Sequence, residues 1–170
     1  MRICTVQRRD WREYREIRLA ALKDTPSAFN STWQEEASQA PPQWMERAQR
    51  SQDGETLTIV VAVDSAGSWV GLVGGYRPGD RGVDAELTSM WVAPDRRGSG
   101  ISTELVRAVL AWAEAHGAST IGLWVNKASP AAISLYEKAG FRRTGEADTL
   151  PSDPTQQEIR MLRCAQREGA

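Results

Sequence analysis

The chain has 170 residues and a formal net charge of −1, with 41% hydrophobic and 25% charged residues. This size and composition predict one globular domain over residues 1–170, with a core at about 3–164 and a tail at 165–170. The near-neutral charge offers no field to attract nucleic acid, and no apolar run is long enough to cross a membrane.

The two ends of the chain carry no sign of targeting or of disulfide chemistry. Residues 1–6 are too few and too mixed in character for a signal peptide. Cys4 and Cys164 lie far apart, without a CxxC motif or a histidine at zinc-ligand spacing. We therefore expect a cytoplasmic protein with free thiols and no metal site.

The first half of the chain predicts helices followed by an antiparallel meander. The expected elements are a strand at 3–6, a helix from Asp10 to Thr25, a short helix opening at Pro41, and strands at 57–63, 69–76 and 85–92, with a turn at 78–82. Apolar residues at helical spacing support the first helix, and apolar runs bounded by turn residues support the strands. The loop at 27–33 is richer in aromatic and hydroxyl side chains than a connector needs.

The second half predicts helices that alternate with strands. The expected elements are a helix from Ile101 to about His116, a buried strand at 120–125, a helix from Ser129 to Gly140, and strands at 141–146 and 158–164, with a loop at 150–154. A glycine at the end of each helix and a proline at the start of the second are typical boundary signals. The chain therefore predicts an α+β domain built on a mixed sheet.

A basic, glycine-rich turn joins the strand at 85–92 to the helix that follows. Gly98 and Gly100 have no Cβ, so an anion can approach the unpaired N–H groups of the first helical turn, where the helix dipole is positive. Arg96 and Arg97 add full positive charges. The pattern indicates a diphosphate site, and the alternative is a tight connection whose arginines are solvated.

Two segments resemble the signatures of the GNAT superfamily of N-acyltransferases. Residues 91–102, WVAPDRRGSGIS, resemble its acyl-CoA loop, Arg/Gln-x-x-Gly-x-Gly/Ala. Residues 126–141, which end in LYEKAGF, resemble its second signature, Leu-Tyr-x-x-x-Gly-Phe. Either motif alone is only suggestive, but the two occur in the family's order with a strand between them. Nucleotide-binding loops fit worse, because Gly-Lys-Ser/Thr and Gly-x-Gly-x-x-Gly are absent.

The resemblance implies the GNAT fold and acetyl-CoA as acyl donor, with no metal. That fold is a twisted, mostly antiparallel mixed sheet of about seven strands with four main helices, and its central strands splay apart at the CoA site. The implied cofactor-binding residues are Met90, Trp91, Val92, Arg97, Gly98, Ser99, Gly100, Ile101, Ser102, Thr103, Asn126 and Ser129. Residues 90–92 would pair with the pantetheine arm through their main chain, much as a peptide adds to a sheet edge. Ser102 and Ser129 depart from the family pattern, which predicts weaker CoA binding without its loss.

The implied reaction is direct attack of an amine on a thioester, which needs a neutral amine and a proton for the leaving thiolate. Tyr136 occupies the position of the family's proton donor to the CoA sulfur; the alternative is one more aromatic in the core. Glu86 lies on the strand before the loop, where histone-type members keep a catalytic glutamate. Its alternatives are an ion pair with an arginine, or a carboxylate that binds the substrate ammonium without taking its proton.

The acceptor is less constrained than the donor. The implied acceptor-binding residues are Phe29, Trp33, Glu36 and Trp124, with the loop at 148–154. Aromatic and carboxylate side chains suit a cationic amine with an apolar part, although Phe29 and Trp33 are equally explained as a cap on the core. We expect acetyl transfer to a small-molecule amine; the alternatives are a protein amino terminus or lysine, or a non-catalytic CoA-binding module. No nucleic-acid or membrane partner is expected, and a homodimer is left open.

Overall fold

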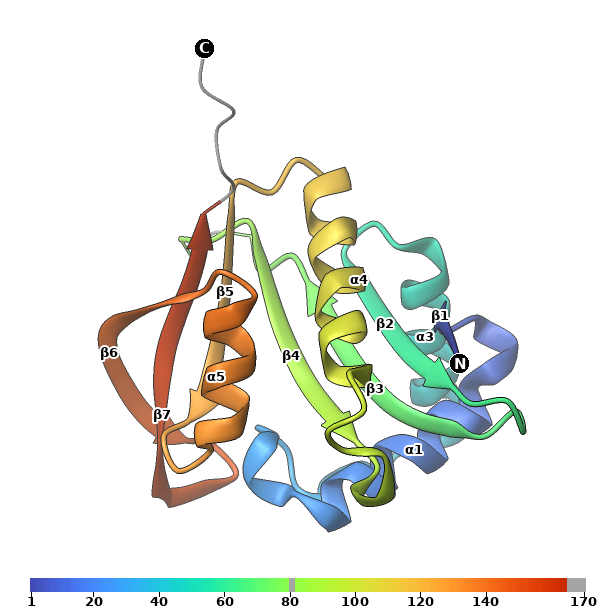
Figure 1. Cartoon of the computed structure of the whole chain (residues 1–170). Helices are drawn as coiled ribbons and strands as arrows, with labels where there is room; N and C mark the ends of the chain where they lie inside the picture. Colours follow the sequence, from blue (N-terminus) through green and yellow to red (C-terminus); the bar gives the residue numbers. More distant parts are fainter. Residues whose placement is uncertain (80–81, 165–170) are drawn as a thin grey trace.

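The computed structural model describes residues 1–79 and 82–164, so the predicted turn at 78–82 is described only in part and the predicted tail at 165–170 lies outside the described residues. Seven strands in this part of the chain form one sheet, in the order β1-β2-β3-β4-β5-β7-β6 (Figure 1). The strands are β1 (Arg2–Thr5), β2 (Leu57–Val63), β3 (Trp69–Tyr76), β4 (Ala85–Val92), β5 (Thr120–Asn126), β6 (Arg142–Leu150) and β7 (Asp153–Cys164). Neighbouring strands are antiparallel except for the central pair, β4 and β5, which is parallel.

Helices cover both faces of this sheet (Figure 1). The longer helices are α1 (Trp11–Asp24), α3 (Pro41–Asp53), α4 (Ile101–Ala115) and α5 (Pro130–Lys138); the shorter elements are α2 (Trp33–Ala37) and the 3₁₀ turns η1 (Arg8–Asp10), η2 (Pro26–Ala28) and η3 (Pro94–Arg96). The core on one face contains residues of α4 and α5, and the core on the other contains residues of α1 and α3. The expected fold, a mostly antiparallel mixed sheet with four long helices, is confirmed.

Burial on both faces explains why β2 reads as an unbroken apolar run. Val60 and Ala62 belong to the core under α4, whereas Ile59, Val61 and Val63 belong to the core under α1 and α3. Successive side chains of a strand point to opposite faces, so a strand covered on both sides needs apolar residues at every position. The predicted bounds of β2, β3 and β4 agree with the structure for this reason.

The expected loop at 27–33 leads into a helix, α2, that the sequence analysis did not predict. Thr32 Oγ1 accepts a hydrogen bond from the N–H of Glu35 (3.3 Å), and the Glu35 carboxylate accepts one from the N–H of Thr32 (2.7 Å). This reciprocal arrangement is a capping box, and Thr-x-x-Glu is its sequence signal. The signal was present at 32–35 and was missed because the helix is short.

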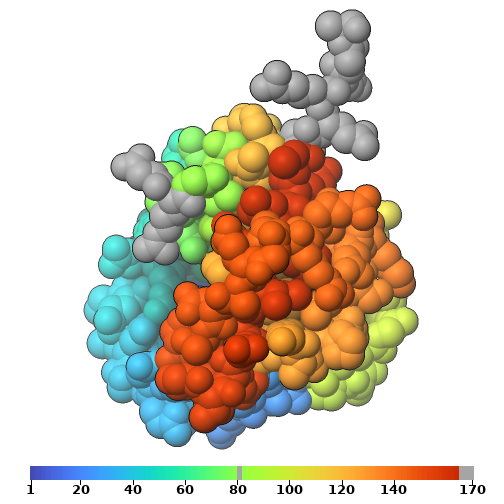
Figure 2. All heavy atoms as spheres, turned by 90° about the vertical axis from the view of Figure 1, so that its left-hand side faces the viewer, coloured from blue at the N-terminus to red at the C-terminus, as the bar shows by residue number. Residues whose placement is uncertain are grey.

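The predicted loop at 150–154 was wrong in its extent. β6 runs to Leu150 and β7 begins at Asp153, and these two residues pair across a turn at Pro151 and Ser152. The register shifts between Thr149 and Leu150, so Pro154 lies at an irregularity, where a missing N–H interrupts no regular ladder. The result is a long β6–β7 hairpin in place of a wide loop; Figure 2 shows it in orange to red, with its tip beside the blue N-terminal segment.

β4 and β5 separate soon after they meet. Within the part of the chain that the structure describes, they pair at Ala85 with Ile121 and at Glu86 with Gly122 and at no later position. Figure 1 shows the two strands close together at the top of the view and diverging towards the bottom, where the segment around η2 lies below the gap. The predicted splay of the central strands is therefore present in the sheet.

Candidate active site

A bulge in β4 widens the opening between β4 and β5. The β3–β4 register shifts between Leu72 and Gly74, and Ser89 has a positive φ of 59°. An extra residue of this kind bends the strand and increases its twist. Arg18 of α1 holds the bulge from the far side, because its guanidinium donates to Ser89 Oγ (2.7 Å). The bulge and the bond from Arg18 therefore stabilise the opening between β4 and β5.

The opening contains a narrow cleft of about 90 Å³. Its walls come from β4, β5, α5 and β7, and include Glu86, Met90, Trp124, Asn126, Ser129, Tyr136 and Glu158. A wider hollow of about 310 Å³ adjoins it and shares Glu86, Trp124 and Glu158 with it. The cleft thus brings residues of the second signature segment together with β4 residues that come just before the first, and it adjoins a larger space beside the β6–β7 hairpin.

The amino terminus of α4 has room for an anion. Gly98 and Gly100 have φ values of 76° and 86°, and a Cβ on either would meet no atom within 4 Å. Ile101 and Ser102 are the first two residues of the helix, so their N–H groups have no carbonyl one turn back. Open space, free donors and the positive end of the helix dipole fit a diphosphate. Ser99 and Thr103 flank these groups, and both are exposed.

Arg97 is already bonded within the chain. Its Nε donates to the carbonyl of Val92 (3.0 Å), and its Nη2 pairs with the Asp24 carboxylate. Asp24 also accepts from Thr25 Oγ1 (2.6 Å) and from Trp91 Nε1 (2.8 Å), and these bonds together with the Arg97 charge lower the pKa of Asp24. The Arg97 side chain is half exposed, so it lies within reach of the loop's surface while tied to the end of α1.

The residues expected to face the pantetheine arm lie at the end of β4. Met90 is half-buried and lines the cleft. Trp91 and Val92 are buried on opposite faces, in the α1–α3 core and the α4–α5 core. Their apolar side chains therefore serve packing, which leaves the main chain of the strand to face β5 across the gap.

Tyr136 of α5 lines the cleft and is 5% exposed. Its ring packs edge-on against Phe141 (5.9 Å between centroids), and its hydroxyl has no hydrogen-bond partner among the described residues. Burial raises the pKa of Tyr136, so the phenol stays protonated at neutral pH. A protonated hydroxyl without a protein partner can donate to a group in the cleft.

Glu86 is held in a buried ion pair. Both of its carboxylate oxygens accept from Arg160 (2.6 and 2.8 Å), and both side chains are 8% exposed. Arg160 reaches across β5 over Gly122, where a Cβ would lie 2.7 Å from the guanidinium carbon. Of the three roles that the sequence left open for Glu86, the structure shows the ion pair with an arginine.

Asn126 and Ser129 lie where β5 turns into α5, and both line the cleft. The Asn126 carboxamide accepts from the N–H of Ala128 (2.8 Å) and donates to Gln156 (2.5 Å) and to the Ser27 carbonyl (3.4 Å). The Ser129 hydroxyl makes no cap bond to α5. Asn126 thus fixes the strand-to-helix turn, and Ser129 presents the freer polar group.

Of Phe29, Trp33, Glu36 and Trp124, only Trp124 borders the cleft and the wider hollow. The expected acceptor segment at 148–154 lines the wider hollow with Asp148, Thr149 and Pro151. Phe29 is 2% exposed and packs under the Arg18 guanidinium (4.5 Å). Trp33 borders a different hollow near the hairpin tip, where Lys23 lies over its ring (5.0 Å). The structure therefore does not bring the four residues into one pocket.

Glu36 is part of a buried ionic network. It is 2% exposed and accepts from Arg18 (2.7 Å), Arg47 (3.0 Å) and Ser31. Burial alone would raise the pKa of Glu36, but the bonds and charge of Arg18, with Ser31 and Arg47, lower it to about 2. Because Arg18 also bonds Ser89, Glu36 acts on the β4 bulge through Arg18 and does not itself face the cleft.

Glu158 of β7 is the site residue that the sequence analysis missed. It is 7% exposed, borders both the cleft and the wider hollow, and has no hydrogen bond or ion pair to any described residue. Burial, and to a lesser degree the charge of Asp148, raise the pKa of Glu158. A sequence signal existed, because Glu158 and Arg160 alternate with Ile159 and Met161, which places the two charged side chains on one face.

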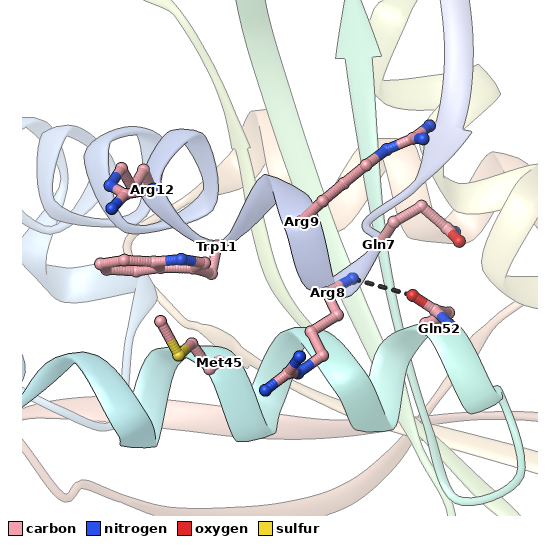
Figure 3. A pocket seen from close by; sticks show the side chains of 7 residues that line it. All are labelled: Gln7, Arg8, Arg9, Trp11, Arg12, Met45 and Gln52. Carbon is pink, nitrogen blue, oxygen red and sulfur yellow. Dashed lines mark hydrogen bonds between the residues drawn. The ribbon is translucent and has the colours of Figure 1, made fainter.

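A further, larger hollow lies away from these residues, between η1 and α3 (Figure 3). Its lining includes three arginines, Arg8, Arg9 and Arg12, with Trp11 and Met45. Figure 3 shows the Trp11 ring between Arg12 and Met45, and Arg9 pointing away from the other arginines. The arginines do not converge on a point, and the hollow shares no residue with the cleft.

Within residues 1–79 and 82–164, no group of three or more His, Cys, Asp or Glu residues is placed to hold a metal ion. No helix in the same part of the chain has the length and apolar character needed to cross a membrane.

An open mixed sheet with a splayed central pair and a helix beginning at its edge is the fold of the GNAT acyltransferases. A phosphinothricin acetyltransferase from Sinorhizobium meliloti, solved with acetyl-CoA, has a TM-score of 0.76 at 19% identity, over 96% of this chain and 87% of that one. A spermidine N-acetyltransferase from Vibrio cholerae, solved with CoA and spermine, has a TM-score of 0.73 at 19% identity, over 96% and 94%.

The model of the acetyltransferase (GNAT) family matches residues 12–141, and the chain therefore belongs to that family. An L-methionine sulfoximine/L-methionine sulfone acetyltransferase from Pseudomonas aeruginosa is 33% identical over 92 residues, which are 52% of each chain. The chain spans about half or less of the length of the curated relatives it matches.

Proposed function

We propose that the protein is an acetyl-CoA-dependent N-acetyltransferase that modifies a small-molecule primary amine in the cleft between β4 and β5. The observation that carries the proposal is the coincidence of three features at one gap in the sheet. These are open space beside unpaired N–H donors at the start of α4, a strand end with main chain facing the gap, and a protonated Tyr136 inside the cleft. Family membership and relatives solved with acetyl-CoA or CoA support this assignment.

Binding of the donor falls to residues around the α4 amino terminus and the β4 end. The N–H groups of Ile101 and Ser102 would hold the diphosphate, with Gly98 and Gly100 giving it access. Arg97 would add its charge by leaving Asp24 or by sharing its guanidinium with the anion. The main chain of 90–92 would pair with the pantetheine arm as an added strand, although the Val92 carbonyl already accepts a hydrogen bond from Arg97 Nε.

The chemistry needs little beyond positioning and a proton. The acetyl thioester of CoA supplies the acyl group. Tyr136 donates its phenolic proton to the sulfur as the carbon–sulfur bond breaks, which avoids release of a free thiolate. Desolvation in the narrow cleft keeps Tyr136 protonated until that moment.

The acceptor enters from the wider hollow beside the β6–β7 hairpin. Trp124 borders this hollow together with carboxylates at Glu146, Asp148 and Glu158. An aromatic face and negative charge suit an ammonium attached to an apolar or cationic body. A spermidine N-acetyltransferase among the structural relatives is named for a small amine of this kind.

Tyr136→Phe tests the proposal. We expect turnover, followed as thiol release with acetyl-CoA and a panel of small amines, to fall about 100-fold, because the proton donor is removed while the ring is kept. Affinity for acetyl-CoA, measured by calorimetry, should change little. Equal turnover in the variant would contradict the proton-donor role, and a wild type that binds acetyl-CoA but acetylates no amine would favour a CoA-binding module.

A further inference from the structure

The carboxylate of Glu158 on β7 is almost buried, and its burial costs folding free energy. Glu158 pairs in register with Asn126 of β5 and with Asp148 of β6, so these three side chains lie in one row on one face of the sheet. Ile159 and Met161, on the opposite face, pack into the α4–α5 core. Glu158 therefore points away from that core and into the space shared by the cleft and the wider hollow.

No positive charge among residues 1–79 and 82–164 forms an ion pair with Glu158. Arg160, two residues along the same strand, has its guanidinium committed to both oxygens of Glu86. Asp148 adds a second negative charge from β6, and Asn126 donates to Gln156 and Ser27. Tyr136 borders the same cleft from α5. A nearly buried carboxylate without a partner costs folding free energy, so its retention calls for a ligand that completes it.

We propose, resting on the acetyltransferase function above, that Glu158 is a catalytic residue that binds the ammonium of the acceptor and accepts one of its protons. The amine nitrogen then bonds to the carbonyl carbon, the carbon–sulfur bond breaks, and Tyr136 gives its proton to the sulfur. The nitrogen loses its second proton to the Tyr136 phenolate, which restores the phenol and leaves the neutral amide. The negative charges of Glu146, Asp148 and Glu158 around the hollow also disfavour an acceptor with its own carboxylate beside the amine. The acceptor class is therefore an amine whose remaining part is uncharged or cationic.

A raised pKa fits this role in a specific way. Burial and the neighbouring Asp148 hold the pKa of Glu158 above its ordinary value, which makes the carboxylate a better proton acceptor than an exposed glutamate. The charged and titratable groups around it are Glu146 and Asp148 from β6, the Glu86–Arg160 pair of β4 and β7, and the phenols of Tyr76 from β3 and Tyr136 from α5. Glu86 is unsuited to the same task because both of its oxygens already accept from Arg160.

The test compares Glu158→Gln with the wild type, and Glu137→Gln serves as the matched control. Glu137 is an exposed carboxylate on α5 that pairs with Arg143 and borders neither hollow. We expect kcat/KM for the amine to fall about 100-fold or more in Glu158→Gln, with unchanged acetyl-CoA affinity and without the acid limb of the pH profile. Glu158→Asp should retain that limb at a reduced rate, and Glu137→Gln should resemble the wild type.

The thermal stability of Glu158→Gln distinguishes a catalytic role of Glu158 from a structural one. Because Glu158→Gln removes an uncompensated buried charge, its thermal midpoint at pH 7 should equal or exceed that of the wild type. A lowered midpoint would reveal a structural partner and overturn the proposal. Full activity with an unchanged pH profile in Glu158→Gln would overturn it while leaving the acetyltransferase function intact. Absence of thiol release in the wild type with every amine would instead reject the function on which the proposal rests.

The acceptor class is tested with 1,5-diaminopentane, which is lysine without its carboxylate. We expect the wild type to use the diamine with kcat/KM at least about tenfold higher than lysine, since a carboxylate in the hollow would face Glu158 and Asp148. Equal use of the two compounds, or a preference for lysine, would overturn this part of the proposal.

Discussion

Gly122 leaves the space through which Arg160 reaches from β7, across β5, to Glu86 on β4. Any side chain at 122 would occupy the volume of the guanidinium. The pair depends on two strands that lie 74 positions apart in the sequence. Gly122 therefore makes room for the ion pair between Arg160 and Glu86.

Gly122→Ala is expected to destabilise the protein by roughly 3 kcal/mol, because displacing Arg160 leaves Glu86 buried without its partner. Gly74→Ala is the control, since a Cβ there would meet Thr88 at 3.2 Å but no charged group. Urea unfolding measures both variants. A loss no greater than that of Gly74→Ala would show that Arg160 can move aside and still hold Glu86.

Individual residues of the site were predictable from the sequence only where a local motif carried them. Tyr136 and Trp124 were placed at the cleft, and Glu86 was expected beside it. Glu158 was missed because its importance comes from the absence of a partner. Glu158 has no partner because Arg160 pairs with Glu86. That pairing depends on the register of β4, β5 and β7, which the local sequence does not reveal.

At the scale of elements, the amino terminus of α4 is the proposed binding site for the diphosphate of acetyl-CoA. Gly98 adopts a positive φ in open space, and so does Gly54, which ends α3 on another part of the molecule. The two positions share a backbone conformation that an L side chain rarely adopts, but they lie at opposite kinds of helix end, Gly54 after α3 and Gly98 before α4.

Gly98→Ala and Gly54→Ala should each lose about 1–2 kcal/mol of stability, because an L side chain at positive φ is strained. Only Gly98→Ala should also weaken acetyl-CoA binding, by about tenfold, since its Cβ would enter the anion's space. Calorimetric titration of both variants measures the difference. Equal affinities in the two variants would place the diphosphate elsewhere.

Elements with a strong period or clear end signals were predicted well. β2, β3 and β4 were predicted with their observed bounds, and α4 with its starting residue, because apolar runs and glycine turns delimit them locally. The β6–β7 hairpin was cut short in prediction because its prolines favour a loop. Its pairing with β5 supplies the stability that local sequence does not show.

At the scale of the whole molecule, Glu36 links the N-terminal helices to the central sheet through Arg18 and Ser89. Its folded-state pKa is about 2, against an ordinary value of 4.5. A lowered folded-state pKa contributes stability that is present above the unfolded pKa and is lost as pH falls through the folded one. The network should therefore fail between about pH 4.5 and pH 2.

Glu36→Gln is expected to lower the free energy of unfolding at pH 7 by about 3 kcal/mol. The difference from the wild type should shrink as pH falls below 4.5. Glu46→Gln, at an exposed position on α3, should change stability by less than about 0.5 kcal/mol. Denaturant unfolding across this pH range gives the measurement, and a difference that does not vary with pH would contradict the ionic role of Glu36.

The family and the fold were predictable because two short motifs and the element order are local properties of the chain. The acceptor side was not, since it is assembled from β4, β5, β7 and the β6–β7 hairpin. Phe29, Trp33 and Glu36 have the residue types expected of an amine pocket, but Phe29 and Glu36 are buried away from the cleft and Trp33 borders a separate hollow.

The most direct test of the central claim is an initial-rate experiment on the wild-type protein with acetyl-CoA and a diamine both varied. Thiol release should require the amine, should match N-acetylated amine one for one, and should give intersecting reciprocal plots, as direct attack in a ternary complex requires. Thiol release that is independent of the amine, or parallel plots that indicate an acetylated enzyme, would contradict the account.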